Sequence, residues 1–194
     1  LRSNGVSLCP FCRTPTHTSN EENIKRLKKR VEVGDAEAMN ILGSCYYEGM
    51  RGLARDHDKA LELWHQAGKV GCTLASNFCI GHAHEHGAGV ERDKMKAKHY
   101  YELAAMMGYA KARHNLGNVE FRERNWDRAT KHWLIAAGSG FNGSVKNIQQ
   151  MYMAGHTKKD DYTNALRAYQ KYIEEIRSEQ RDKAAAYSDK YKYY

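Results

Sequence analysis

The sequence predicts an all-α protein, specifically a right-handed α-solenoid of antiparallel helical hairpins. Composition is the first observation: the chain of 194 residues has only 2 prolines and is rich in Ala, Leu, Lys, Glu and Arg, which favour helices over strands. Its 41% hydrophobic content is too high for an intrinsically disordered chain. The second observation is an internal repeat of about 37 residues, in which each copy predicts two helices. One such hairpin cannot bury its own apolar face, so we expect the hairpins to stack.

The repeat is visible in two motifs that alternate along the chain. A short motif opens each repeat with a glycine, at Gly34, Gly71, Gly108 and Gly140. A longer motif, Asp-x-x-Lys-Ala-x-x-x-Trp-x-x-Ala in residues 56–67, aligns without gaps to residues 93–104 and, less completely, to residues 125–136. The third repeat is shorter because the glycine-rich turn between its helices is missing, and hairpins tolerate deletions in turns. The four predicted repeats are residues 34–70, 71–107, 108–139 and 140–181.

Each repeat carries the pattern of two antiparallel helices. In the first repeat, Ala38, Leu42 and Tyr46 recur every fourth residue and so form one apolar stripe on the first helix. In the second helix, Ala60 and Ala67 share a face, where their small side chains allow a neighbouring helix to approach closely. The aromatic residue between these alanines is expected to fill the core, as Trp64, Tyr101 or Trp133. We expect the second helices to begin at N-cap side chains, at Asp56, Asp93, Asn125 or Asp161.

Further segments flank the predicted solenoid. Residues 19–33 are expected to form a capping helix, which begins with a capping box of Ser19 and Glu22. The last helix of the fourth repeat is expected to run past Ile176. Residues 182–194 are predicted to form a charged, Tyr-rich C-terminal helical tail.

The first repeat resembles a known family. Its pattern Ala-x-x-x-Leu-Gly-x-x-Tyr-x-x-Gly, which starts at Ala38, is similar to the Sel1-like repeat, a relative of the tetratricopeptide repeat. The resemblance covers residues 34 to about 173, roughly 70% of the chain. The second repeat departs at Ile80 and Ala83, where Gly and Tyr are expected, and the fourth has Tyr172 where a small Ala is expected. The resemblance implies a protein interaction scaffold, with a concave groove that binds a peptide or partner protein.

A second resemblance is confined to the first 18 residues. The motif is Leu8-Cys9-Pro10-Phe11-Cys12-Arg13, and it resembles the last metal-binding knuckle of a RING-type zinc finger. Two cysteines supply half of a tetrahedral zinc site, and the upstream ligands of such a finger are absent from this sequence. A structural turn and a redox pair are the alternatives for Cys9 and Cys12. Residues 1–18 are therefore expected to be an extended or disordered remnant of the finger, with its metal site empty.

The RING resemblance, together with a first residue that is Leu1 rather than Met, suggests a fragment of a longer protein. The intact parent would hold zinc, contact a ubiquitin-conjugating enzyme through its finger, and be similar to E3 ubiquitin ligases. In this alternative, the present chain is the substrate-recruiting part of the ligase. The chain itself is expected to have no catalytic residues and no cofactor.

Charge and motifs disfavour most other functions. The net charge of +8 is spread over three segments, and the one dense basic run, residues 25–30, is expected to be the solvated face of an amphipathic helix, so we expect no nucleic-acid binding. No apolar run approaches the roughly 20 residues that span a bilayer, and no signal peptide opens the chain, so we expect no membrane association. Five irregularly spaced cysteines fit a reducing compartment, the cytoplasm with the nucleus as the alternative.

Two histidines form the sharpest remaining cluster. His82 and His86 are one helical turn apart and could chelate a metal, but the sequence offers no third ligand. A partly exposed helix end is therefore the favoured interpretation. Signatures of phosphoryl transfer, acyl transfer and zinc proteases (GxxxxGK[ST], GxSxG and HExxH) do not occur in the sequence.

The predicted binding site is the groove lined by the first helix of each repeat. In tetratricopeptide-like hairpins these helices face the concave side, and here they carry hydrogen-bonding side chains at matching positions. Amide, aromatic and basic side chains in such a groove favour a peptide with acidic groups or a free C-terminal carboxylate, bound by a monomer. The alternative is that these polar side chains are simply solvated. The candidate peptide-binding residues are Asn40, Tyr47, Asn77, His84, His114, Asn118, Arg122 and Lys146.

We predict that the purified chain retains no stoichiometric zinc, because Cys9 and Cys12 provide only half of a tetrahedral site. Elemental analysis after dialysis against a weak chelator is the measurement. A Cys9→Ser/Cys12→Ser variant serves as the control and should have the same metal content. One zinc ion per chain in the parent, lost in this variant, would contradict the prediction.

Overall fold

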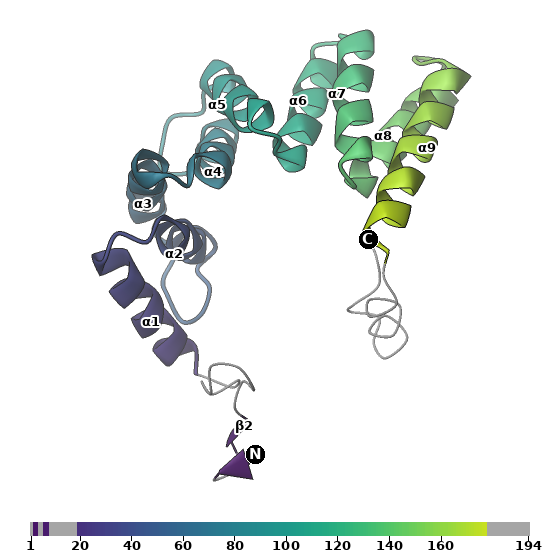
Figure 1. The fold of residues 1–194 in the computed structure, drawn as a ribbon. Coiled ribbons are helices and arrows are strands. Elements are labelled where there is room, and N and C mark those ends of the chain that lie inside the picture. The colour runs from purple at the N-terminus through teal and green to yellow at the C-terminus, as the bar shows by residue number, and fades with distance from the viewer. Residues whose placement is uncertain (1, 4–5, 8–18, 178–194) are drawn as a thin grey trace. The chain divides into compact units, whose positions relative to one another are not determined.

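The computed structural model describes residues 2–3, 6–7 and 19–177 (Figure 1). Within these residues nine α-helices follow one another, and the predicted all-α class is confirmed. The described strands, β1 (Arg2–Ser3) and β2 (Val6–Ser7), form one short antiparallel pair. Cys9, Cys12 and the predicted tail at residues 182–194 lie outside the described residues. The helices are α1 (Asn20–Glu32), α2 (Ala36–Glu48), α3 (His57–Val70), α4 (Thr73–His86), α5 (Lys94–Met106), α6 (Ala110–Arg122), α7 (Trp126–Gly138), α8 (Asn142–Met153) and α9 (Lys159–Ile176).

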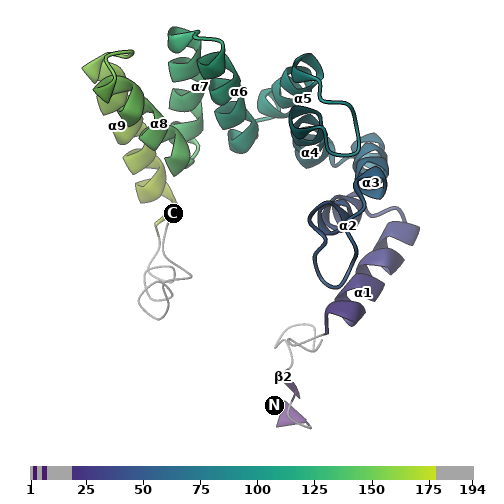
Figure 2. The same cartoon turned by 180° about the vertical axis from the view of Figure 1, so that it is seen from behind.

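The helices fall into two units, which are described separately. Unit 1 (residues 1–93) contains α1 to α4; α2 and α3 form its central hairpin, α1 packs on α2, and α4 packs on α3. Unit 2 (residues 94–194) contains α5 to α9; α6 and α7 form its central hairpin, α5 packs on α6, and α8 and α9 pack on α7 and on each other. Figure 2 shows the same pairs of helices from behind.

Two polar side chains cap helices of unit 1 at the predicted positions. Ser19 Oγ accepts a hydrogen bond from the Glu22 backbone N–H at 3.2 Å, at the start of α1. Asp56 Oδ1 accepts from the Lys59 backbone N–H at 3.0 Å, at the start of α3. Because such a bond satisfies a backbone donor that has no partner within the helix, each cap stabilises its helix by about 1 kcal/mol.

In unit 2, α7 begins after Asn125 as predicted, but neither Asn125 nor Asp161 makes the predicted capping hydrogen bond, because each side chain has another partner. Asn125 precedes α7, but its side-chain oxygen accepts no hydrogen bond from the backbone N–H groups of the first turn. Its Nδ2 group donates to Glu120 Oε2 at 2.9 Å. Asp161 lies within the first turn of α9, since this helix already begins at Lys159. Its Oδ2 atom accepts from Thr157 Oγ1 at 3.1 Å. The carboxylate therefore holds the turn before α9 in place.

The end of α9 also differs from the prediction. The helix stops at Ile176 rather than running past it, because Arg177 has an extended backbone with φ of −68° and ψ of 135°. One turn earlier in α9, the ring of Tyr172 lies against Gly140, and a Cβ atom at position 140 would overlap this ring. Gly140 also has a φ of 84°, which favours glycine. The bulky Tyr172 therefore fills space beside the turn that opens the fourth repeat.

A buried tryptophan fixes the α6–α7 hairpin in unit 2. Trp133 is 2% exposed, and its indole Nε1–H donates to the His114 carbonyl and to Asn118 Oδ1, each at 3.2 Å. The indole ring lies directly over Gly117, where a Cβ atom would overlap it. Glycine at this position therefore gives the indole the room that it needs to reach the α6 backbone.

The α2–α3 hairpin of unit 1 repeats this arrangement. Trp64 Nε1 donates to the Asn40 carbonyl at 3.2 Å, and a Cβ atom on Gly43 would approach Trp64 Nε1 to 2.7 Å. The aligned sequence shows that the two residues vary together. Where the glycine is replaced, by Ile80 and Gln149, the tryptophan is replaced by the smaller tyrosine, at Tyr101 and Tyr169.

We predict that Gly117→Ala lowers the free energy of unfolding by about 1–3 kcal/mol, although Ala favours a helix over Gly by about 1 kcal/mol. The reason is that the added methyl group would overlap the Trp133 ring. In a Trp133→Tyr background the same substitution should cost less, because the smaller ring leaves room. A double-mutant cycle by urea unfolding measures this coupling.

Gly138→Ala is the matched control, because its Cβ atom would meet only the Ala168 methyl group, at an ordinary 3.7 Å. This substitution should leave stability unchanged or raise it. Equal destabilisation by Gly117→Ala and Gly138→Ala would contradict the packing described for Trp133.

Candidate functional site

Polar side chains of unit 2 connect α6 to α8 through hydrogen bonds. His114 Nδ1 and Ser144 Oγ share a hydrogen bond at 2.9 Å, and the His114 ring lies 4.5 Å from the Phe141 ring, centroid to centroid. One turn further along α6, Asn118 Oδ1 accepts from Asn147 Nδ2 at 3.0 Å. We call this surface the α6–α8 face. It is made by His114, Asn118 and Arg122 of α6 with Lys146 and Asn147 of α8.

Burial sets the charge of His114. It lowers the pKa of the His114 imidazole to about 4, so the ring is neutral at pH 7. The sequence suggested that His114 helps to attract an acidic peptide, but a neutral ring contributes no positive charge. The positive charges on the α6–α8 face therefore come from Arg122 and Lys146, whose side chains are exposed.

The amides of the α6–α8 face keep part of their hydrogen-bonding capacity. Asn118 uses its oxygen twice, for Trp133 and Asn147, while Asn147 uses its NH2 group once. Within the described part of the chain, the Asn118 NH2 group and the Asn147 oxygen have no protein partner, and both residues are half-buried. Phe121, which follows Asn118 by three residues on α6 and so lies on the same side of the helix, is 41% exposed. The face therefore offers a donor, an acceptor and an aromatic ring, which suit a peptide backbone with one apolar side chain.

The four candidate residues of unit 1 have different surroundings. Tyr47 and His82 share a hydrogen bond between the Tyr47 hydroxyl and His82 Nδ1, at 3.1 Å, and the Tyr47 ring lies 5.3 Å from that of Trp64. Burial raises the pKa of Tyr47, and the neighbouring Glu48 adds to this. Asn40 and Asn77 are half-buried on α2 and α4, whereas His84 is 9% exposed and belongs to the interior. The structure thus places Tyr47 and His84 mainly in packing contacts.

Glu120 is a buried ionic group that the sequence analysis missed. Its side chain is fully buried, with Lys98 Nζ at 2.8 Å from Oε1 and Asn125 Nδ2 at 2.9 Å from Oε2. Burial alone would raise the pKa of Glu120, but the bonds from Lys98 and Asn125 outweigh it and lower this pKa. Glu120 occupies the stripe position of Tyr46 in the first repeat, so a charged residue in an apolar stripe was the available signal.

The predicted pair of His82 and His86 was compared with the requirements of a metal site. The described residues contain no cluster of three or more His, Cys, Asp or Glu side chains arranged to hold a metal ion. His82 and His86 do lie together, with ring centroids 4.2 Å apart, and His86 Nδ1 donates to the His82 carbonyl at 3.0 Å.

Of the helices in the described ranges, none combines the length and the apolar character that crossing a bilayer requires.

Comparison with known proteins identifies the repeats. Residues 36–72 and 76–109 match the model of the Sel1 repeat family, which does not extend to Cys9 and Cys12. Among curated proteins, the ERAD-associated E3 ubiquitin-protein ligase component HRD3B of Arabidopsis thaliana is 32% identical over 113 residues, 58% of this chain and 17% of HRD3B. The HRD3A component of the same plant is 34% identical over 102 residues, 52% of this chain and 14% of HRD3A. The chain thus spans less than a fifth of these relatives.

Solved structures confirm the predicted architecture. The protective antigen c5321 of uropathogenic Escherichia coli, which displays an SLR fold, has a TM-score of 0.64 and 28% identity, covering 80% of this chain and 34% of c5321. A Sel1 repeat protein from Oxalobacter formigenes has a TM-score of 0.66 and 26% identity, covering 79% of this chain and 64% of that protein. Residues 36–72 and 76–109 therefore match Sel1 repeats, and the chain has the fold of these solved structures.

We predict that protonation of His114 destabilises the protein in mild acid. The unfolded chain binds a proton at this residue below about pH 6.5, whereas the folded chain does so only near pH 4, so the free energy of unfolding falls as the pH decreases through this window. The loss between pH 7 and pH 5 is expected to be on the order of 1 kcal/mol, reduced by the partial exposure of the ring.

Urea unfolding of the parent and of His114→Gln at several pH values tests this prediction. The variant should show a shallower pH dependence, while His99→Gln, which changes an exposed histidine of α5, should keep the slope of the parent. A His114→Gln variant with the slope of the parent would contradict the assignment.

Proposed function

We propose that this Sel1-like repeat protein is an interaction scaffold, and that the α6–α8 face of unit 2 binds an extended segment of a partner protein. Sel1 repeats mediate protein interactions, which supports a binding role for the chain as a whole. The observation that carries the proposal is the Asn118–Asn147 pair. Its bond of 3.0 Å holds the two amides in a fixed orientation and leaves a donor and an acceptor for a ligand.

The neighbouring side chains suggest what such a segment contains. A peptide backbone presents alternating N–H and C=O groups, which an amide pair can bond on one edge. The exposed ring of Phe121 offers an apolar contact, and it is held in place by the Trp126 and Trp133 rings, whose centroids lie 5.2 and 5.7 Å away. Arg122 and Lys146 favour carboxylates near the same segment, either acidic side chains or a free C-terminus.

The test is selection of peptides from a random display library against the full chain. We predict that selected peptides are enriched in Asp and Glu or require a free C-terminal carboxylate. An Arg122→Glu/Lys146→Glu variant should bind them at least about tenfold more weakly, about 1.4 kcal/mol. The matched control is Lys131→Glu/Lys159→Glu, the same change of charge on exposed residues of α7 and α9.

Thermal unfolding verifies that both variants fold, and amidated peptides distinguish a free C-terminus from acidic side chains. Equal weakening by the two double variants, or selected peptides without acidic groups that bind all variants equally, would contradict the proposed α6–α8 site. Failure of the library to yield any binder of the parent would contradict a peptide-binding function.

We propose as a second candidate that the chain is the substrate-recruiting part of an E3 ubiquitin ligase. The supporting observation is its similarity to HRD3B and HRD3A, whose names describe components of such a ligase. In the version suggested by the sequence, Cys9 and Cys12 would end a RING-type finger that holds zinc in the parent. Sequencing the reading frame upstream of Leu1 tests this version, because a parent with a RING-type finger must encode further Cys and His residues there at zinc-ligand spacing.

A further inference from the structure

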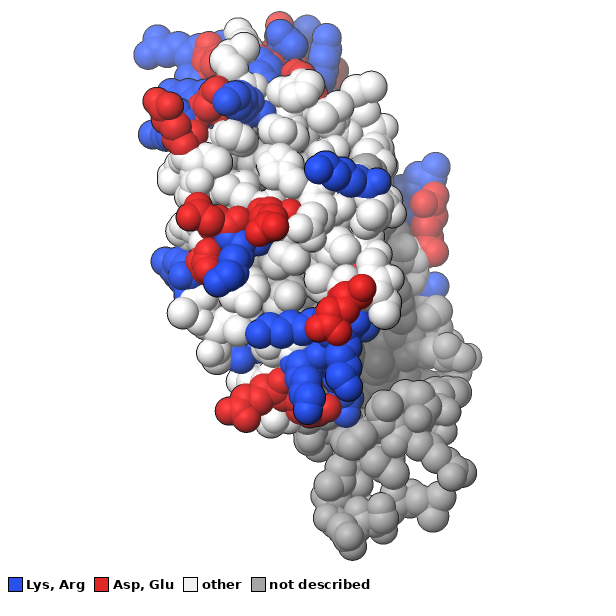
Figure 3. Space-filling model, turned by 90° about the vertical axis from the view of Figure 1, so that its left-hand side faces the viewer, with Lys and Arg blue, Asp and Glu red and all other residues white. Residues whose placement is uncertain are grey.

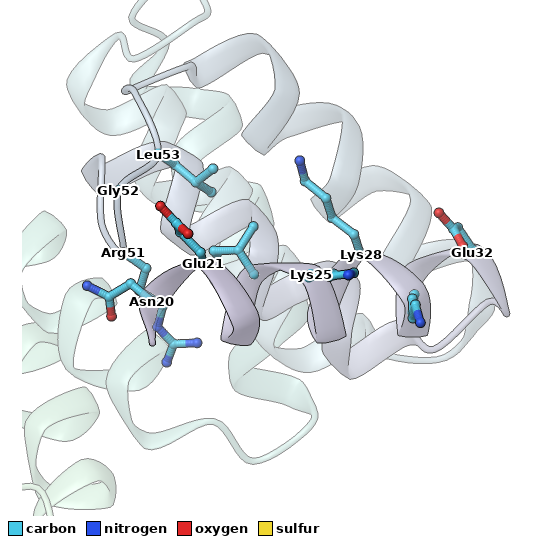
Figure 4. Close-up of a pocket in the computed structure, with 10 residues that line it drawn as sticks. Asn20, Glu21, Lys25, Lys28, Glu32, Arg51, Gly52 and Leu53 are labelled. Atoms are coloured by element: carbon cyan, nitrogen blue, oxygen red, sulfur yellow. The ribbon is translucent and has the colours of Figure 1, made fainter. Parts of the chain in front are cut away.

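A groove in unit 1 lies between α1 and the turn of residues 51–53 (Figure 4). Its volume is about 730 Å³, within the range of roughly 300–1,000 Å³ that is usual for ligand-binding clefts. Ile24 of α1 and Leu53 of the turn supply apolar side chains to it. Figure 4 shows Lys28 extending from α1 on the side where Leu53 lies. The groove therefore combines a small apolar floor with basic side chains.

The basic side chains of the groove have no charged partner within the described part of the chain. These side chains are Lys25, Lys28, Lys29 and Arg51. Basic residues on α1 that do not line the groove are paired: Arg26 lies 3.3 Å from Glu22, and Arg30 lies 2.7 Å from Asp35. Figure 3 shows Lys and Arg side chains gathered toward the lower end of the face that it presents, with Asp and Glu side chains among them. The unpaired positive charge of this helix is thus concentrated at the groove.

Two carboxylates limit the length of the anionic ligand that the groove can accept. Glu21 and Glu32 line the groove near the two ends of α1. The eleven helical steps between them correspond to about 16 Å, which equals about five residues of an extended peptide. A long polyanion such as nucleic acid would be repelled by a carboxylate at each end, whereas a short acidic segment would lie between them.

We propose that this groove, which we call the α1 groove, binds a short acidic segment of a partner protein, about five residues long. Carboxylates of the segment would pair with Lys25, Lys28 and Arg51, and one apolar side chain would contact Ile24 and Leu53. The first 18 residues of this chain contain no Asp or Glu, so they lack the charge that the groove requires. The α1 groove belongs to unit 1, so this proposal does not depend on the α6–α8 face of unit 2.

The probe is a fluorescein-labelled peptide of sequence Gly-Glu-Glu-Leu-Glu-Glu-Gly, and fluorescence anisotropy measures its binding to the full chain. The parent should bind it with a dissociation constant below about 1 mM. A Lys25→Gln/Lys28→Gln variant should bind it at least about tenfold more weakly. The matched control is Arg26→Gln/Arg30→Gln, which removes two positive charges from the same helix outside the groove and should bind like the parent.

Further measurements distinguish binding in the α1 groove from attraction to net charge and from binding at a different surface. Circular dichroism should show native helix content and melting in both variants. Equal weakening by the two variants would indicate attraction to net charge and overturn the proposal, as would no binding by the parent. Loss of binding only in Arg122→Glu/Lys146→Glu would assign the probe to the α6–α8 face. A 20-nucleotide RNA that binds more tightly than the peptide and displaces it would overturn the proposal, because the ligand of the groove would then be nucleic acid rather than an acidic protein segment.

Discussion

The hydrogen bond from the Trp133 indole to the α6 backbone is the constraint on which much of unit 2 depends. The indole reaches the His114 carbonyl because Gly117 leaves room for the ring. The same N–H also reaches Asn118 Oδ1, and this second contact orients the amide that meets Asn147 on α8. Packing within one hairpin therefore determines how polar groups are presented on the surface shared with the next helix.

Features that repeat along the chain could be predicted from the sequence, whereas features that depend on a partner far along the chain could not. The hairpins, and the burial of Trp64, Tyr101 and Trp133, could be predicted because helical spacing and small residues recur in register. The roles of His114 and Asn118 could not, because their partners lie about 30 residues later on α8. Polar residues of the first helices looked available for a ligand, but the structure shows several of them bonded to a neighbouring helix.

Local competition for hydrogen bonds explains why the capping bonds predicted for Asn125 and Asp161 do not form. Asn125 and Asp161 have the chemistry of N-caps, but each bonds a nearby side chain that the repeat pattern does not contain. In the case of Asn125 that partner is Glu120, which stands in an apolar stripe and needs Lys98 and Asn125 to offset its burial. Where a repeat departs from its consensus, its neighbours change their roles with it.

The joint variation of glycine and tryptophan has a consequence for how such arrays diversify. In the first repeat Gly43 of the first helix is matched to Trp64 of the second helix, and in the fourth repeat Gln149 is matched to Tyr169. A crossover between copies that joined the first helix of one to the second helix of another would separate these partners. Whole hairpins are therefore the natural unit of exchange during evolution, and chimeras made by protein engineering should be joined in the connections between hairpins rather than in the turn inside one.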